Sequence, residues 1–381
     1  MHVRTPTHPS NHQAQPPPPP PSPRSFAAHN THEPLEAPEA VLDQFAFIYD
    51  NCTAALGLPA VSGKNSCSSV LARGRRGGGG AAAADDAADA SGPLEGLVKQ
   101  CCFRQYYSAM AHYVDGHVGQ VVAALKAKGM WANTLLVLSA DNGGPIYRNG
   151  AAGGNNWPHR GGKKSNFEGG VRVNALAAGG LIPPAQVGTT TTAWMGTEDW
   201  YTTFCALAGV SPEDHVAAAA GLPPVDGVNL WPLLSGANST PPRTEVWLGS
   251  AGAGNVDNSK EPIIQALIRA DGYKLIHGLV NQDAWTGPFY PNATTSWCDT
   301  CTLDCGPIDA PTCLFNVLDD PTEHNELSAQ HPDIVASMAA RLQELAKTVF
   351  APDRGKEDTT NACHAGDVTW GGFVGPFLPG Y

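Results

Sequence analysis

Residues 135–144 read Leu-Leu-Val-Leu-Ser-Ala-Asp-Asn-Gly-Gly and decide the fold class. The unbroken apolar run 135–138 is typical of a central strand in a parallel sheet, because such a strand is buried on both faces. Before it, apolar residues from Met110 to Leu125 recur at helical spacing, and Gly129 is placed to end that helix. A helix followed by a buried strand is the repeating unit of an α/β fold.

The predicted strand ends in Asp141 and Asn142, which are the first candidate site residues. Ligands of α/β proteins bind at the carboxyl ends of the strands, so polar side chains there favour a functional interpretation. Taken alone, however, Asp-Asn-Gly-Gly is more often an ordinary turn, since Asn and Gly tolerate the backbone angles that turns require.

The later part of the chain changes to an antiparallel pattern. Ile263–Ala270 and Tyr273–His277 flank Asp271-Gly272, a preferred dipeptide for a hairpin turn. Leu314–Leu318 predicts a further strand, and apolar residues over 334–345 predict an amphipathic helix. We therefore predict a larger α/β domain over residues 26–240, a smaller C-terminal α+β subdomain over 241–350 and a tail over 351–381.

The first hundred residues hold two segments of low complexity. Residues 1–25 form a Pro-rich arm, which we expect to be extended or disordered. Residues 51–101 contain runs of Gly and Ala and show poor periodicity, which predicts a flexible surface insertion. The arm contains no apolar stretch of the kind that serves as a signal peptide.

Composition excludes several classes of protein. The chain has 381 residues, of which 42% are hydrophobic, so it can bury a sizeable core and is not wholly disordered. Its net charge of −12 leaves no basic surplus to neutralise phosphates, which argues against a nucleic-acid partner. No apolar run reaches the length of a membrane span.

Cysteines and glycosylation sequons favour an oxidising, secretory compartment. The chain has 10 cysteines and carries Asn-x-Ser/Thr triplets at Asn51, Asn238 and Asn292. Two interpretations are open for the C-terminal cysteines, Cys298, Cys301, Cys305 and Cys313. Their irregular spacing favours disulfides over a zinc cluster, and the sequence does not give the pairing.

Several ordered motifs resemble those of the sulfatases, most closely the arylsulfatase B-like group. These segments are His32–Pro38, Asp141–Gly144, Gly153–Pro158, Arg160–Lys163, Phe167–Arg172, Val225–Trp231, Leu314–Asn316 and Asp320–Asn325. The resemblance covers roughly residues 26–50 and 103–350. It implies an alkaline-phosphatase/sulfatase-like α/β fold, a mixed sheet flanked by helices, and hydrolysis of sulfate esters on aryl or carbohydrate alcohols.

The resemblance also implies roles for four residues. Asp141 and Asn142 match metal ligands, and oxygen donors of this kind suit Ca²⁺. Lys163 matches the lysine that contacts the sulfate, although Lys164 lies next to it. His32 matches a histidine near the sulfate, where it would be a donor or proton carrier. Without the motif order, Arg160–Lys164 would be taken for a solvated loop and His32 for a surface histidine.

Half of the expected site has no counterpart in the sequence. The sulfatase nucleophile is a formylglycine made from Cys in Cys-x-Pro/Ala-x-Arg, and no such pentapeptide occurs in the chain. The family's N-terminal Asp-Asp metal pair and its Gly-Lys-Trp-His segment are also unmatched. We therefore expect a sulfatase that lacks its N-terminal portion, with an incomplete Ca²⁺ site and no activity as a 381-residue chain.

Two other functions remain as alternatives at this stage. One is a non-catalytic binding protein built on a partial sulfatase fold. The other is a related metal-dependent phosphoesterase, which needs a second cluster of Asp and His that the sequence does not show. The expected location is a secreted or lysosome-like compartment, and the oligomeric state stays open.

Overall fold

A computed structural model describes most of the chain outside its N-terminal arm. The described residues are 37–55, 57, 67, 93–146, 153–251, 264–287, 301–306, 312–348 and 359–372. The predicted Pro-rich arm and His32 lie outside them. No helix in the described part combines the length and the apolar character that crossing a membrane requires.

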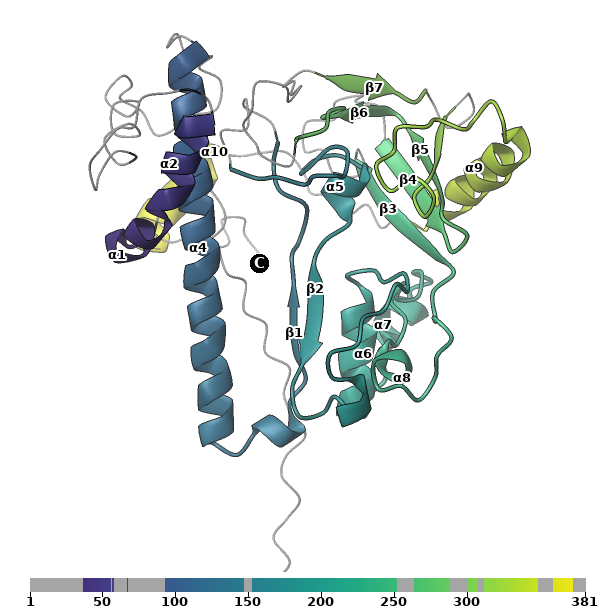
Figure 1. Ribbon diagram of the computed structural model, residues 1–381. Helices are drawn as coiled ribbons and strands as arrows, with labels where there is room; N and C mark the ends of the chain where they lie inside the picture. The colour runs from purple at the N-terminus through teal and green to yellow at the C-terminus, as the bar shows by residue number, and fades with distance from the viewer. Residues whose placement is uncertain are drawn as a thin grey trace, which may run out of the picture.

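The N-terminal part is a helical unit built around one long helix. Its elements are α1 (Glu39–Leu42), η1 (Asp43–Phe45), α2 (Ala46–Ala55) and α4 (Pro93–Ala127). Helices α1 and α2 lie against the first half of α4 (Figure 1). Buried side chains from both segments, Tyr49 and Met110 among them, form a common core.

The predicted flexible insertion over 51–101 is wrong at both of its ends. Residues up to Ala55 continue α2, and α4 already begins at Pro93. Disulfides Cys52–Cys101 and Cys67–Cys102 tie the segment to α4. Residues from both ends also pack in one apolar cluster with Tyr49 and Met110. The interior of the predicted insertion, apart from Gly57 and Cys67, lies outside the described residues.

After α4 the chain turns through Gly129, which has a left-handed φ of 66°, and η2 (Trp131–Asn133) into β1 (Leu136–Ser139). The predicted helix and strand are therefore both present. In the described residues, however, β1 pairs only with β2 (Ala175–Ala178), and the pair is antiparallel. The prediction of a central parallel strand is wrong here, and Leu138 is 44% exposed because no described strand covers it.

Short helices lie on both sides of β2 in the sequence. Helix α5 (Glu168–Val171) precedes the strand, and η4 (Pro184–Gln186), α6 (Asp199–Ala208), α7 (His215–Ala219) and α8 (Trp231–Leu234) follow it. The buried Asp199 begins α6 and accepts backbone hydrogen bonds from Gly196 and Val228, both at 2.8 Å. Arg243 pairs with the same carboxylate, so one ion pair joins α6 to the chain segments that flank it.

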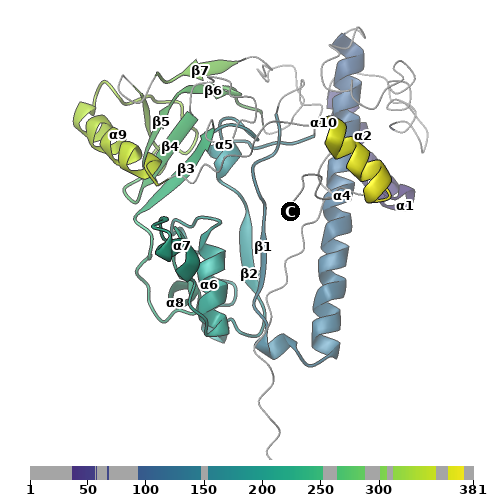
Figure 2. The same cartoon turned by 180° about the vertical axis from the view of Figure 1, so that it is seen from behind.

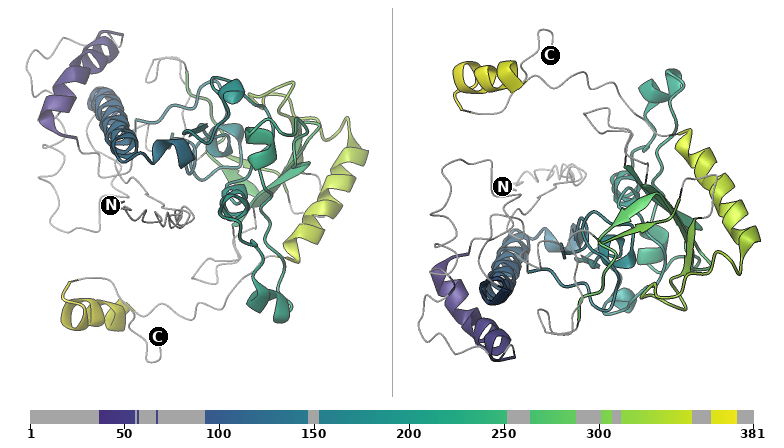
Figure 3. Two further views of the ribbon diagram at one scale, coloured as in Figure 1. Left: turned by 90° about the horizontal axis from the view of Figure 1, so that it is seen from below. Right: turned by 90° about the horizontal axis from the view of Figure 1, so that it is seen from above.

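An antiparallel sheet forms the C-terminal part. Its strands are β3 (Glu245–Ala251), β4 (Ile264–Arg269), β5 (Tyr273–His277) and β8 (Cys313–Asn316), in the order β3-β4-β5-β8. The predicted hairpin at Asp271-Gly272 is confirmed as the β4–β5 turn. Helix α9 (Pro332–Ala346) covers one face of the sheet (Figure 3). Its Met338 and Leu342 pack against buried leucines of the strands.

Smaller elements complete the described chain. They are β6 (Leu279–Asn281), β7 (Thr302–Asp304), α10 (Thr359–His364) and the π-helical turn η5 (Ala365–Thr369). Cys305 is bonded to Cys313, and Cys301 is also disulfide-bonded, so the disulfide interpretation is confirmed for these cysteines over the zinc cluster. The domain boundary proposed at residue 240 stays a prediction.

Candidate active site

The end of β1 presents the two predicted metal ligands in a defined turn. The Asp141 side chain is exposed, and its Oδ1 atom accepts the backbone N–H of Asn142 at 2.8 Å. The amide nitrogen of Asn142 donates to the Gly143 carbonyl oxygen at 3.0 Å. That bond uses the amide nitrogen, so the amide oxygen is the atom suited to bind a cation.

The next two residues pack backbone against backbone. A Cβ atom added to Gly143 would lie 1.7 Å from the carbonyl oxygen of Gly169, so only glycine fits. The Gly143 N–H donates to the Gly170 carbonyl oxygen at 2.9 Å. We call this contact between Gly143 and residues 169–170 the glycine junction. It fixes the end of β1 against α5.

Asn156 joins the same turn to the loop that carries the predicted sulfate-binding lysine. Its side chain accepts the N–H of Gly144 at 2.9 Å and donates to the carbonyl oxygens of Gly144 at 2.7 Å and Gly161 at 3.0 Å. The Lys163 N–H donates to the Gly144 carbonyl oxygen at 3.2 Å. The structure therefore places the backbone of Lys163 beside the turn that follows Asp141 and Asn142.

The two neighbouring lysines of this loop differ in their surroundings. Lys163 is half-buried, and its carbonyl oxygen accepts a hydrogen bond from the Gln282 side chain. Lys164 is exposed and has a left-handed φ of 75°. The sequence motif alone did not decide between the two lysines. Lys163 is the better candidate to face a bound group, because it is half-buried and hydrogen bonds hold both its N–H and its C=O.

The segment Arg160–Lys164 is not a solvated loop, because Arg160 is buried. Arg160 is 7% exposed and donates to the Asp283 carboxylate and to the Glu323 carbonyl oxygen, the latter at 2.8 Å. Its guanidinium carbon lies 4.3 Å from the Phe167 ring centroid and 4.5 Å from that of Trp285. Arg160 is thus a structural cation that anchors the loop to the C-terminal part.

A buried cluster of three charges lies behind α5. Lys274 of β5 contacts the carboxylates of Glu168 at 3.1 Å and Glu323 at 2.8 Å, and each side chain is at most 1% exposed. Glu323 also accepts the Glu168 N–H at 2.6 Å. Both glutamates lie in sulfatase-like motifs of the sequence, but the sequence alone gave them no role. Their partner Lys274 lies in β5, which contains none of these motifs.

The pKa values of this charge cluster reflect one lysine shared by two carboxylates. Burial lowers the pKa of Lys274, but Glu323 and Glu168 outweigh it, and the pKa lies above its ordinary value. Burial raises the pKa of Glu323, and Glu168 raises it further, against the effect of Lys274. The ammonium therefore stays charged, and the cluster depends on it.

Comparison with known proteins decides the family. Residues 21–210, half of the chain, match the family model described as Sulfatase. Arylsulfatase J of Mus musculus is 29% identical over 282 residues, which cover 70% of this chain and 44% of that protein. Steryl-sulfatase of Rattus norvegicus is 37% identical over 136 residues, which cover 34% of this chain and 22% of that protein. The chain belongs to the sulfatase family.

This sulfatase chain spans about half the length, or less, of the relatives it matches. Among solved structures, Ps i-CgsB in complex with k-i-k-neocarrahexaose superposes with a TM-score of 0.50 at 21% identity. The match covers 88% of this chain and 51% of that chain. This match confirms the predicted α/β, sulfatase-like fold. At this level of identity the likeness concerns the fold alone.

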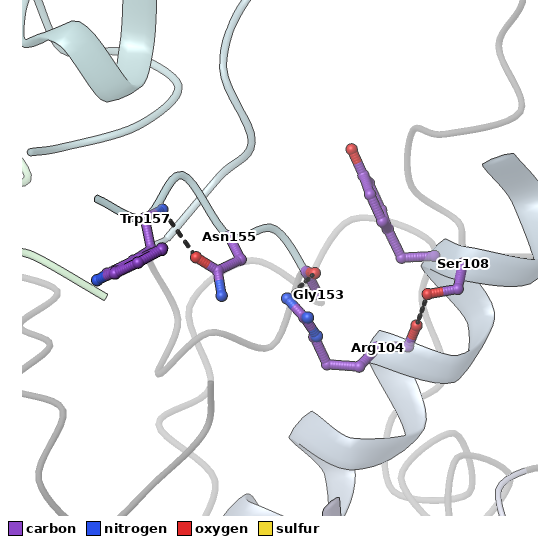
Figure 4. Close-up of a pocket in the computed structure, with 6 residues that line it drawn as sticks. Arg104, Ser108, Gly153, Asn155 and Trp157 are labelled. Atoms are coloured by element: carbon purple, nitrogen blue, oxygen red, sulfur yellow. Dashed lines mark hydrogen bonds between the residues drawn. The ribbon is translucent and has the colours of Figure 1, made fainter. Parts of the chain in front are cut away.

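A pocket of about 360 Å³ opens beside the candidate site of the sulfatase (Figure 4). Its walls are α4 and the loop 153–157. The lining residues are Arg104, Tyr107, Ser108, Gly153, Asn155 and Trp157. Asn155 therefore faces this pocket while its neighbour Asn156 binds the turn after β1, so one short segment links the two places.

The donor set fits only part of a calcium site. Asp141 and Asn142 carry oxygen donors for at most two positions of a Ca²⁺ shell, whereas Ca²⁺ takes about six to eight oxygen ligands. Among the residues that the structure describes, no group of three or more His, Cys, Asp or Glu side chains is placed to hold a metal. The Ca²⁺ role of Asp141 and Asn142 therefore stays a prediction. His32, the predicted histidine near the sulfate, lies outside the described residues.

Proposed function

We propose that this chain carries the metal-binding and sulfate-binding part of a sulfuric ester hydrolase site of the arylsulfatase type. Asp141 and Asn142 would be ligands of Ca²⁺, and Lys163 would contact the sulfate group. The observation that supports the proposal is the hydrogen bond from the Lys163 N–H to Gly144, which holds this lysine's backbone two residues from Asn142.

The chemistry of each group matches its proposed task. Bound Ca²⁺ would polarise a sulfate oxygen. The ammonium of Lys163 is a compact positive charge that offsets the negative charge on the sulfate oxygens, and this charge grows in the transition state. His32 would be a hydrogen-bond donor or proton carrier near the same group. The relatives' names, an arylsulfatase and a steryl-sulfatase, support a sulfate ester as the substrate.

The finer parts of the proposal concern cofactor and location. The sulfatase formylglycine has no source in these 381 residues, since they contain no Cys-x-Pro/Ala-x-Arg. We propose a secretory or lysosome-like compartment and N-glycosylation at the sequons, because the disulfides of the chain need an oxidising environment. The ligand pair of Asp141 and Asn142 would bind Ca²⁺ weakly on its own.

The 381-residue chain is expected to show no turnover of an aromatic sulfate, with or without Ca²⁺. Loss of a covalent nucleophile costs on the order of a millionfold in rate, which removes detectable activity. Release of 4-nitrophenol from its sulfate ester, measured beside an Asp141→Ala, Lys163→Ala double variant, checks this. Wild-type turnover clearly above that of the double variant would overturn the expectation.

The missing nucleophile also favours a second candidate function, a binding protein on a partial sulfatase fold. Measurements on the natural protein from its source cells distinguish the two candidate functions. A mass larger than the 39.8 kDa of this chain, with a Cys-x-Pro/Ala-x-Arg peptide and aryl sulfate turnover, would establish the enzyme. A natural protein that binds sulfated ligands without turnover would establish the binding protein.

A further inference from the structure

We infer that Gln282 positions Lys163 for contact with the sulfate group, by holding the peptide between Lys163 and Lys164 in one of its two possible orientations. The inference rests on the proposed function, because it concerns the same lysine. Gln282 is 4% exposed, and its side-chain amide donates to the Lys163 carbonyl oxygen. It follows β6 directly and lies 119 residues from Lys163 in the sequence.

Lys163 and Lys164 are the central residues of a turn that Gly162 and Ser165 close. The Ser165 N–H donates to the Gly162 carbonyl oxygen at 3.0 Å, and the Ser165 hydroxyl bonds both polar groups of the Gly162 backbone. The left-handed φ of 75° at Lys164 is typical of the third residue of a type II turn. In that turn the peptide between the two central residues is flipped relative to a type I turn.

Gln282 supplies the bond that favours the flipped peptide. A type I turn needs no left-handed residue, so a lysine at position 164 would by itself favour that form. The bond from Gln282 to the Lys163 carbonyl oxygen offsets this preference. Gly144 accepts the Lys163 N–H at 3.2 Å, so the peptides on both sides of the lysine Cα atom are held. The direction of the lysine side chain is then fixed as well.

The Gln282 amide serves this contact at a cost to stability. The Lys163 carbonyl oxygen is an acceptor, so the amide nitrogen of Gln282 must face it. The other amide atom, Oε1, is buried and has no hydrogen-bond partner in the described part of the chain. A Cβ atom added to Gly162 would lie 3.2 Å from Oε1, which therefore packs beside the same turn. A buried acceptor without a partner is unfavourable, so stability alone does not explain a glutamine at this position.

Backbone strain gathers around the same loop. In the part of the chain that the structure describes, non-glycine residues with a left-handed φ are Lys164, Gln282 and Glu323. Gln282 has a φ of 61°, and Glu323, with a φ of 55°, accepts a hydrogen bond from Arg160 at its carbonyl oxygen. Residues in this conformation persist only where their surroundings impose it, and they concentrate at functional sites. The strain thus falls on residues that hold or follow Lys163.

Other bonds hold the rest of the loop without Gln282. The Gly161 N–H donates to the Ala284 carbonyl oxygen at 2.8 Å, and Arg160 forms an antiparallel β-bridge with Trp285. Loss of the Gln282 amide should therefore release one peptide and leave the loop in its place.

Titration of inorganic sulfate in the presence of Ca²⁺, followed by calorimetry, tests the role of Gln282. Gln282→Met keeps the length of the side chain but removes the donor, and it should weaken sulfate binding by about tenfold. Its urea unfolding midpoint should not fall, because methionine also removes the unpartnered Oε1 and lets the strained turn relax. In the Lys163→Ala background, Gln282→Met should change the sulfate affinity by less than about twofold.

Two further variants separate positioning from a general structural role. Lys164→Gly should restore most of the affinity that Gln282→Met loses, because glycine adopts the left-handed φ of the turn without help. Gln105→Met is the matched control. It removes another buried amide, 7% exposed, that donates to the Leu42 carbonyl oxygen at 2.9 Å, and it should leave sulfate binding unchanged.

The outcomes separate this inference from the proposed function. If Lys163→Ala weakens sulfate binding and Gln282→Met does not, the role of Gln282 is overturned and the proposed function stands. A lower unfolding midpoint in Gln282→Met, with no rescue by Lys164→Gly, would show a structural role only and would also overturn the inference. If Lys163→Ala leaves the sulfate affinity unchanged, the proposed function is wrong and the inference falls with it.

Discussion

Replacing Lys274 by Met is expected to lower the free energy of unfolding by about 3–5 kcal/mol, because the change leaves two buried carboxylates without their cation. Met keeps most of the apolar volume of the lysine side chain, so the effect isolates the charge. Glu168 and Glu323 are at most 1% exposed and both contact Lys274. Urea unfolding followed by circular dichroism measures the loss.

Two further variants control this prediction. Arg341→Met removes the ion pair with Glu245, in which the arginine side chain is 49% exposed, and should cost less than about 1 kcal/mol. The triple variant Lys274→Met, Glu168→Gln, Glu323→Gln removes the unpaired charges and should recover part of the loss. A Lys274→Met protein as stable as Arg341→Met would show that the buried cluster does not hold α5 against β5.

Gly143→Ala is expected to destabilise the protein by about 3 kcal/mol or more and to weaken sulfate binding, because the added Cβ cannot fit against the Gly169 carbonyl oxygen. The glycine junction must open, and the end of β1 then moves away from α5. Urea unfolding and sulfate titration report the two effects separately.

The matched control is Gly119→Ala, in the second half of α4. A Cβ atom there meets nothing within 4 Å, and alanine is preferred to glycine inside a helix by about 0.5–1 kcal/mol. Gly119→Ala should therefore raise the stability slightly and leave sulfate binding unchanged. Equal effects of the two substitutions would contradict a special role of the glycine junction.

Local signals in the sequence predicted much of the fold. The Asp271-Gly272 turn and the amphipathic pattern of α9 depend only on residues that are close in sequence. Both predictions are confirmed. The order of the motifs, rather than any one of them, predicted that Asp141, Asn142 and Lys163 share a site, and this stays a prediction. The structure places the backbone of Lys163 beside Gly144, two residues after Asn142.

Contacts between distant segments escaped prediction for a physical reason. Glu168 and Glu323 are 155 residues apart, and neither has a neighbour in sequence that signals burial of its charge. The partner of a strand is equally hidden, since the apolar run at β1 predicts burial but does not identify the strand beside it. Figure 2 shows the β1–β2 pair between α4 and the C-terminal sheet.

Titration of inorganic sulfate in the presence of Ca²⁺ tests the central claim most directly. The account predicts that Lys163→Ala weakens sulfate binding by at least about tenfold, while Lys164→Ala, next to it but exposed, changes the affinity by less than about twofold. Equal affinities before and after the Lys163→Ala substitution would contradict it.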